Sequence, residues 1–276
     1  MTIIADSGST KTTWMEVESG NKVVTEGLNP HFTDDEAFLA ACAAVHQHFP
    51  LSTFHFPLHF YGAGCGSEVQ RTRVASLLAK AFGTSDIHVE TDMLGACRAL
   101  CGHEAGLVGI LGTGSNACYY DGKKITHQAV STGYILGDHG SANHVGRLLL
   151  QDYLSGSMPE ELSTLFHEAY PQSKDEFLDA VYHQPHANRF LASLAPFAVQ
   201  HLGDDYCRRV VEHTLEDWLT DALMPLWRQV GDVTLHVVGG YAKAIEPTLR
   251  LVMEDRGLAV GTVLSDPIDG LRRFHG

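Results

Sequence analysis

Short apolar stretches separated by glycine-containing turns open the chain, and this pattern predicts a strand-rich start. Strands are expected over residues 2–6, 12–17 and 22–26. Apolar residues then recur at helical spacing over residues 34–48, which predicts a helix. The pattern that follows predicts a strand over 58–61, a helix over 67–82, a strand over 87–90 and a helix over 93–101. Strands that alternate with helices in this way indicate an α/β protein.

The same opening returns near the middle of the chain. Strands are expected over residues 107–111, 117–120 and 123–128, and the Asp121-Gly122 pair between the last two favours a hairpin. A long helical region follows over 141–227, with breaks near Gly156, Pro171 and Gly203, and then a strand over 234–238, a helix over 245–256 and a strand over 260–264. A repeat on this scale predicts two related lobes.

We place these lobes at residues 1–106 and 107–276, and we expect each to hold a mixed five-stranded sheet flanked by helices. No low-complexity linker marks the boundary, so the lobes should pack together around a cleft.

Composition excludes several classes of protein. Of the 276 residues, 44% are hydrophobic and 19% are charged, as in soluble globular proteins. No apolar run reaches the about 18 residues of a membrane helix, and the first residues do not resemble a signal peptide, so we expect a cytoplasmic protein with no membrane partner. The net charge of −14 argues against nucleic acid, whose phosphates require a basic surface.

The first turn carries the strongest chemical signal. An apolar strand delivers Asp6 into the turn 7–12, which is rich in small and hydroxyl residues. Gly8 allows a ligand to approach the backbone, and the N–H groups of the turn can surround an anion. Ser9, Thr10 and Thr12 offer hydroxyl donors and Lys11 a positive charge. A carboxylate beside phosphate suits Mg²⁺, so Asp6 is the candidate metal ligand. An ordinary hairpin turn is the alternative.

Two further turns strengthen this interpretation. The second strand of this type runs into Gly112-Thr113-Gly114-Ser115, and two such turns, each opening a similar lobe, would suit a nucleotide whose phosphates lie between them. The third is Gly239-Gly240 at the end of the strand 234–238, where adenosine could lie flat against backbone. A simple strand-to-helix turn explains this third feature equally well.

In this order, the three turns resemble those of actin-like ATPases, which have a ribonuclease H-like fold. More narrowly, the chain resembles the BadF/BadG/BcrA/BcrD ATPase family and its N-acetylglucosamine kinases. Four further stretches carry this resemblance: Gly27-Leu28-Asn29-Pro30, Glu90-Thr91-Asp92, Gly137-Asp138-His139-Gly140-Ser141 and Pro267-Ile268-Asp269-Gly270-Leu271. The resemblance spans almost the whole chain and is weakest in the helical region from about 151 to 230.

The resemblance implies an ATP- and Mg²⁺-dependent kinase that phosphorylates the 6-hydroxyl of a free amino sugar, with N-acetylglucosamine as the expected substrate and a homodimer as the expected assembly. It implies that Asp92 is the general base, although capping of the next helix is an alternative role. It further implies that the sugar contacts Asn29, Thr113, Gly133 and Asp138.

One departure from the family bears on the substrate. His139 stands where these kinases carry glutamate, which removes an acceptor and leaves glucosamine and N-acetylmuramic acid as alternative substrates. A sugar-independent ATPase that activates a dehydratase is another alternative. It would need paired cysteines for a shared cluster, whereas Cys97 and Cys101 have the wrong context and are expected to be buried thiols. A related repressor would need a DNA-binding module ahead of Asp6.

Overall fold

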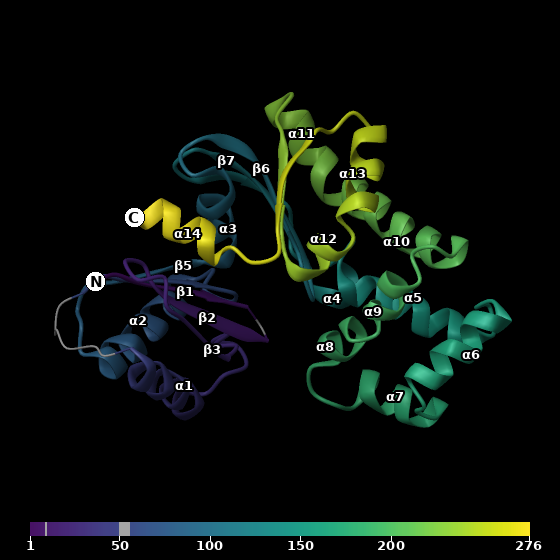
Figure 1. Cartoon of the computed structure of the whole chain (residues 1–276), viewed down its shortest axis with the longest axis horizontal. Coiled ribbons are helices and arrows are strands. Elements are labelled where there is room, and N and C mark those ends of the chain that lie inside the picture. Colours follow the sequence, from purple (N-terminus) through teal and green to yellow (C-terminus); the bar gives the residue numbers. More distant parts are fainter. Residues whose placement is uncertain (9, 50–55) are drawn as a thin grey trace. The chain divides into compact units, whose positions relative to one another are not determined.

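The computed structural model describes residues 1–8, 10–49 and 56–276, and it divides into two compact units (Figure 1). Unit 1 comprises Met1–Glu104, Gly122–Lys124 and Asp266–Gly276, and unit 2 comprises Ala105–Asp121 and Ile125–Ser265. The boundary therefore lies two residues before the expected one. The C-terminal segment departs further from the expected division. Residues Asp266–Gly276 pack in unit 1, whereas the sequence places them in the second lobe.

The sheet of unit 1 contains five strands in the order β3-β2-β1-β4-β5. These are β1 (Ile3–Ser7), β2 (Lys11–Glu16), β3 (Lys22–Glu26), β4 (Leu58–Gly62) and β5 (Ile87–Thr91). The first three form an antiparallel meander, and β4 and β5 continue from β1 in parallel. This sheet is therefore mixed, as the sequence predicts.

Alternation along β1 divides the core of unit 1 between the two faces of the sheet. Ile3 and Ala5 pack with the apolar sides of α1 (Asp35–His48) and α2 (Glu68–Phe82), whereas Ile4 packs on the opposite face. That second face is covered by α3 (Asp92–Cys101) and α14 (Ile268–His275) (Figure 1).

Helix α14 was not expected, and its packing explains why the C-terminal segment joins unit 1. Ile268 and Leu271 are its buried apolar residues, a weak helical signal in sequence. Gly270 lets the helix approach α3 closely, because a Cβ there would lie 2.4 Å from the carbonyl oxygen of Ala99. Arg272 adds a hydrogen bond of 2.7 Å to the Val17 carbonyl.

The sheet of unit 2 repeats the topology of unit 1, with the order β10-β9-β6-β7-β8. Its strands are β6 (Ala105–Leu111), β7 (Ser115–Asp121), β8 (Ile125–Gln128), β9 (Leu235–Val238) and β10 (Val260–Leu264). Again three strands form an antiparallel meander, and two more extend the sheet in parallel from the first strand. The predicted repeat is confirmed.

The helices of unit 2 lie mostly between β8 and β9 in the chain. They are α4 (Gly133–Leu136), α5 (Ala142–Ser155), α6 (Glu160–Ala169), α7 (Lys174–Tyr182), α8 (Ala187–Ala192), α9 (Ala195–Gln200), α10 (Asp205–Trp218), the π-helix η1 (Leu219–Leu223), α11 (Met224–Val230), α12 (Gly240–Ala244) and α13 (Glu246–Asp255). The expected breaks near Gly156, Pro171 and Gly203 all fall between helices.

Trp218 connects this helical region to the sheet. The side chain is 1% exposed, and it fits against two glycines whose missing Cβ atoms would lie 2.6 Å (Gly109) and 2.7 Å (Gly140) from it. Gly109 belongs to β6, and Gly140 belongs to the loop before α5. The indole therefore fixes α10 against both the sheet and the loop that carries Asp138.

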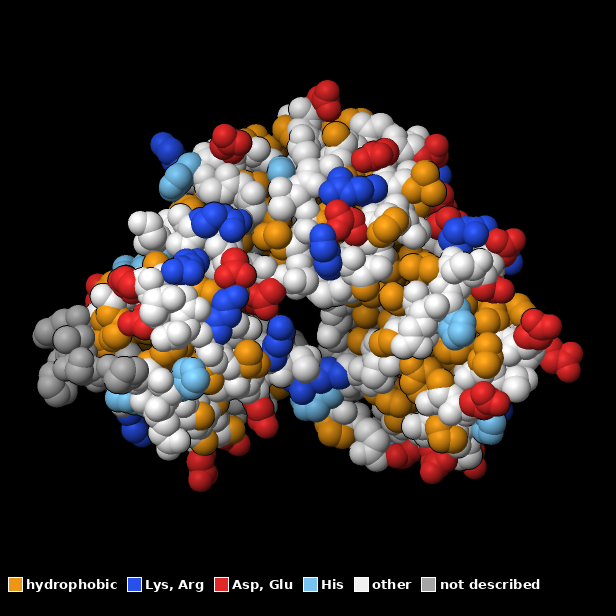
Figure 2. Space-filling view, in the orientation of Figure 1, with side chains coloured by type: hydrophobic (Ala, Val, Ile, Leu, Met, Phe, Trp, Pro, Cys, Tyr) orange, Lys and Arg blue, Asp and Glu red, His pale blue; other side chains and the backbone are white. Residues whose placement is uncertain are grey.

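The surface carries charge of both signs. On the face drawn in Figure 2, basic side chains lie among acidic ones over each unit. None of the helices in the described part of the chain has the length and apolar character needed to cross a bilayer.

Candidate functional site

Three carboxylates lie close together in unit 1, at the end of its parallel strands. Asp6 alternates with Ala5 on β1 and so faces α3 and α14. Asp92 is the first residue of α3, and Asp266 lies two residues before α14. The structure therefore brings the predicted metal ligand and the predicted base together, and it adds Asp266, which the sequence analysis missed.

The electrostatics of Asp6 reflect this crowding. Burial, followed by the negative charges of Asp266 and Asp92, raises the pKa of Asp6 to about 8, against a smaller lowering effect of Lys11. Lys11 Nζ lies 3.2 Å from Asp266 Oδ2, with the lysine side chain 60% exposed. The positive charge of one exposed lysine thus faces the negative charge of three carboxylates, and the excess negative charge favours binding of a further cation.

The hydroxyl groups near the first turn mostly build the turn itself. Ser7 and Thr12 are fully buried and their hydroxyl oxygens are 2.8 Å apart. The Thr12 hydroxyl donates to the Glu26 carbonyl at 3.0 Å, so the expectation that it donates to a ligand is wrong. The Gly8 N–H donates to the Lys11 carbonyl at 3.0 Å. Thr10 is exposed, and Ser9 lies outside the described residues.

Asp92 has two features that suit a base. The cap of α3 is Thr91, whose hydroxyl accepts the Leu94 N–H at 3.1 Å, so Asp92 is not the N-cap residue. Its carboxylate accepts the adjacent Met93 N–H at 2.9 Å. Burial raises the pKa of Asp92, while the Met93 N–H opposes that shift.

Asn29 lies beside the turn that follows β4. Its Oδ1 accepts the His31 N–H at 3.0 Å and would be only 2.4 Å from a Cβ on Gly64, which has φ +83°. The next residue, Cys65, is close enough to Asp92 for that carboxylate to raise the pKa of its thiol, after the larger effect of burial. Asn29 and Asp92 therefore flank the same turn.

The turn 112–115, predicted to bind phosphate and named here the second phosphate turn, lies in unit 2 between β6 and β7. The Gly112 N–H closes it by donating to the Gly114 carbonyl at 2.9 Å. Ser115 uses its polar groups within the protein. Its N–H donates to Asp138 Oδ1 at 3.3 Å, and its hydroxyl donates to the His139 carbonyl at 2.6 Å.

Asp138, predicted to contact sugar, is tied to this turn. It has a left-handed backbone with φ 54°, and its carboxylate lies where a Cβ on Gly114 would be, 2.7 Å from Oδ2. Burial raises the pKa of Asp138, although the Ser115 N–H opposes the shift. His139 turns toward η1, with its Nδ1 2.6 Å from Asp221 Oδ2. Gly133 begins α4 with φ +74° and has open space around it.

The Gly239-Gly240 turn lies against the second phosphate turn. Gly239 has φ +143°, and a Cβ there would lie 2.0 Å from the Leu111 carbonyl oxygen. No other residue type fits this backbone and this contact. Around Gly240, by contrast, the described residues leave open space. The structure therefore brings two of the three predicted turns together within unit 2.

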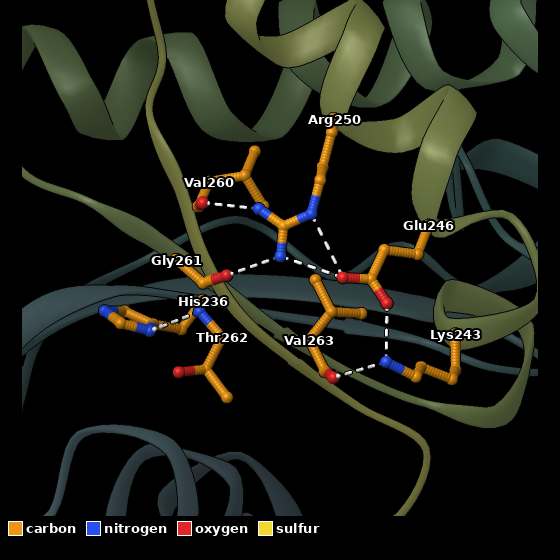
Figure 3. Close-up of polar contacts among 8 residues, drawn as sticks. All are labelled: His236, Lys243, Glu246, Arg250, Val260, Gly261, Thr262 and Val263. Atoms are coloured by element: carbon orange, nitrogen blue, oxygen red, sulfur yellow. Dashed lines mark hydrogen bonds and ion pairs between the residues drawn. The ribbon is translucent and has the colours of Figure 1, made fainter.

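A polar network not predicted from the sequence joins the helices that follow this third turn to β10 (Figure 3). Arg250 donates to Glu246, and also to the carbonyls of Val260 and Gly261 at 2.6 and 2.8 Å. Glu246 also pairs with Lys243, on the helix that begins at Gly240. The network fastens α12 and α13 to β10, at the irregularity in the β9–β10 pairing.

No protein-family model and no curated protein matches the chain. Among solved structures, a candidate N-acetylglucosamine kinase of Porphyromonas gingivalis matches with a TM-score of 0.93 and 36% identity, covering 100% of this chain and 98% of its own.

Two more distant structures show the fold alone. A candidate N-acetylglucosamine kinase from Chromobacterium violaceum has a TM-score of 0.76 and 17% identity, over 100% of this chain and 99% of its own. A ROK-family glucokinase from Streptomyces griseus, in complex with glucose and AMPPNP, has a TM-score of 0.57 and 15% identity, over 99% and 97%. The actin-like ATPase fold predicted from sequence is confirmed.

Proposed function

The chain belongs to the N-acetylglucosamine kinase-like branch of the BadF/BadG/BcrA/BcrD ATPase family, and from this premise we propose that it is an ATP-dependent sugar kinase. We propose further that it phosphorylates the 6-hydroxyl of a free amino sugar, with N-acetylglucosamine as the first substrate to test. The full-length likeness at 36% identity to a candidate N-acetylglucosamine kinase carries this proposal.

Asp92 takes the proton from the sugar hydroxyl in this mechanism. A neutral hydroxyl is a poor nucleophile toward phosphorus, and a carboxylate at the N-terminus of α3 can accept its proton as the new bond forms. The raised pKa of Asp92 increases its affinity for that proton. Placement of the reacting groups accounts for most of the remaining rate, because phosphoryl transfer leaves little covalent work to the protein.

Asp6 would hold the Mg²⁺ ion. Its crowded position fits a cation, since burial and then the negative charges of Asp266 and Asp92 raise its pKa, against a lowering effect of Lys11. Among the residues described, no group of three or more His, Cys, Asp or Glu side chains is arranged to hold a metal. This suits Mg²⁺, which usually binds one or two carboxylates and completes its shell with phosphate and water. When bound, the ion offsets the charge of the transferred phosphoryl group.

The remaining predicted residues bind the two substrates. Within the turn 112–115, the N–H groups of Thr113 and Gly114 would donate to nucleotide phosphates, since those of Gly112 and Ser115 already have partners in the protein. The predicted residues Gly8, Thr10 and Lys11 would bind phosphate at the first turn. Adenosine would lie at Gly239-Gly240, where the Gly239 N–H donates to the Leu264 carbonyl at 2.9 Å. The predicted sugar contacts are Asn29, Asp92, Thr113, Gly133 and Asp138.

An ADP-release assay across free hexoses and amino sugars tests the proposal. We expect Mg²⁺-dependent ATP turnover that rises when an amino sugar is added, with N-acetylglucosamine most effective. A preference for glucosamine or N-acetylmuramic acid would support the proposed kinase activity and identify a different substrate. ATP turnover that no sugar alters would contradict the kinase and support the sugar-independent ATPase.

A further inference from the structure

The start of α5 holds the second phosphate turn from behind. The first two N–H groups of this helix donate to consecutive carbonyls of the turn, Ala142 to Gly112 at 3.0 Å and Asn143 to Thr113 at 3.1 Å. Both carbonyls of the turn therefore point toward α5. The helix has unsatisfied N–H groups at this end, so these contacts also complete its own hydrogen bonding.

The Asn143 side chain adds two hydrogen bonds from a buried position. It is 1% exposed, and its Nδ2 donates to the Thr113 carbonyl at 2.6 Å and to Asp138 Oδ2 at 3.1 Å. The other oxygen of Asp138 accepts the Ser115 N–H. A single amide group thus fastens the middle of the turn directly and its end through Asp138.

This arrangement determines where the N–H groups of the turn point. In a trans peptide the C=O of one residue and the N–H of the next point in opposite directions. With the Gly112 and Thr113 carbonyls directed at α5, the N–H groups of Thr113 and Gly114 point away from it. Neither N–H has a hydrogen-bond partner among the described residues. Two adjacent, outward-pointing N–H groups form a site for an anion.

We infer that Asn143 is a positioning residue for nucleotide phosphate: it fixes the peptide between Thr113 and Gly114 so that the Gly114 N–H is directed at the anion. The inference rests on the proposed function, because it assumes that the turn binds the phosphates of ATP. Without the amide, the Thr113 carbonyl keeps a single bond and Asp138 Oδ2 loses its donor among the described residues. The peptide is then held by one hydrogen bond in place of two and flips more readily, and a flipped peptide presents a carbonyl oxygen to the phosphate.

The residue type matters as much as its position. Asn143→Leu keeps the volume of the buried side chain and removes both donors. Asn143→Asp also keeps the volume, but it places a carboxylate against the Thr113 carbonyl and the Asp138 carboxylate. We expect both variants to weaken binding of Mg²⁺–AMPPNP by about 10- to 100-fold, the loss of one hydrogen bond to a charged group. The aspartate variant should be the weaker binder.

The test is titration calorimetry of the full-length protein with Mg²⁺–AMPPNP in the absence of sugar, together with KM values for ATP and for sugar. Nucleotide affinity and KM for ATP should change, and KM for sugar should change far less. Ser141→Ala is the matched control. It removes the cap of the same helix, which accepts the His144 N–H, so it should lower the melting temperature without changing nucleotide affinity.

The outcomes separate the inference from the proposed function. A wild-type protein that neither binds AMPPNP nor uses ATP contradicts the proposed function. A wild-type protein that binds, with Asn143→Leu and Asn143→Asp melting lower but binding equally well, overturns the inference alone. If Asn143→Leu does not fold, hydrogen exchange of the peptide spanning 112–115 in Asn143→Asp decides: AMPPNP should protect it in the wild type and not in the variant.

Discussion

The two phosphate turns have the same topology and different chemistry. In each unit the turn joins the first two strands of a meander, and the last paired residues before it are Ser7 with Thr12 and Leu111 with Ser115. Counting back from these pairs, Asp6 corresponds to Ile110. The acid that makes the first turn a candidate metal site is therefore missing from the second.

The turns are also held in different ways. Buried hydroxyls of Ser7 and Thr12 fix the first turn, and an exposed lysine balances part of its negative charge. The second turn has no charged residue of its own and is held by the start of α5 and by Asn143. The repeat thus preserves a backbone frame, whereas the proposed metal ligand and the proposed base are side chains of unit 1 and the proposed phosphate donors in unit 2 are backbone N–H groups.

Asp92→Asn tests whether the chemical step belongs to unit 1. We expect turnover to fall by roughly 10²- to 10⁴-fold, the usual effect of losing a general base, while AMPPNP affinity is nearly unchanged. The substitution is almost isosteric, and Thr91 still caps the helix. Steady-state kinetics and a melting curve give the answer. A folded variant with wild-type sugar phosphorylation would show that another group takes the proton.

The Asp6→Asn substitution should lower activity and raise stability at pH 8. Activity at limiting Mg²⁺ should fall at least about tenfold, the minimum expected for loss of a charged ligand. The pKa of Asp6 is about 8 in the folded protein, against 3.8 ordinarily, so its ionisation increasingly favours unfolding as pH rises from about 4 to 8.

The Mg²⁺-free Asp6→Asn variant should therefore melt at the wild-type temperature near pH 4 and above it at pH 8. Saturating Mg²⁺ should reduce the difference. Melting curves of the two proteins across this pH range check the sign, and a variant that is less stable at pH 8 would contradict it.

Gly239→Ala tests the backbone contact between the two turns of unit 2. The new Cβ would meet the Leu111 carbonyl, and the positive φ disfavours alanine, so unfolding free energy should fall by about 2 kcal/mol or more. Gly240→Ala is the control, because the space around Gly240 is open. Denaturant unfolding of both variants measures the difference. Equal stabilities would mean that the contact is not tight.

The smallest effect concerns acid stability of unit 1. His59 stacks between His88 and His275, and burial with the charges of His88 and Arg98 lowers its pKa to about 4. The unfolded chain takes up this proton near pH 6.5, so stability should fall as pH drops from about 6.5 to 4.

His59→Phe keeps an aromatic ring and removes the titration, so its melting temperature should fall less steeply over this pH range. Identical slopes for wild type and His59→Phe would contradict the prediction.

Sequence alone determined the repeated frame. Strand alternation and glycine-rich turns depend on neighbours in the chain, so the two meanders, the three turns and the breaks at Gly156, Pro171 and Gly203 could be predicted. The parallel pairing of β1, β4 and β5, found in the structure, then brings Asp6 and Asp92 to the same edge of the sheet.

Only the tertiary structure decided which side chains complete each turn. Asp266 contacts Lys11 although the two are far apart in the chain, because the apolar residues of α14 pack on the sheet of unit 1. Asn143 looks in sequence like an ordinary polar residue of a helix, and its contact with Thr113 exists only once α5 lies behind the turn. Such contacts join residues far apart in the chain, and local periodicity carries no information about them.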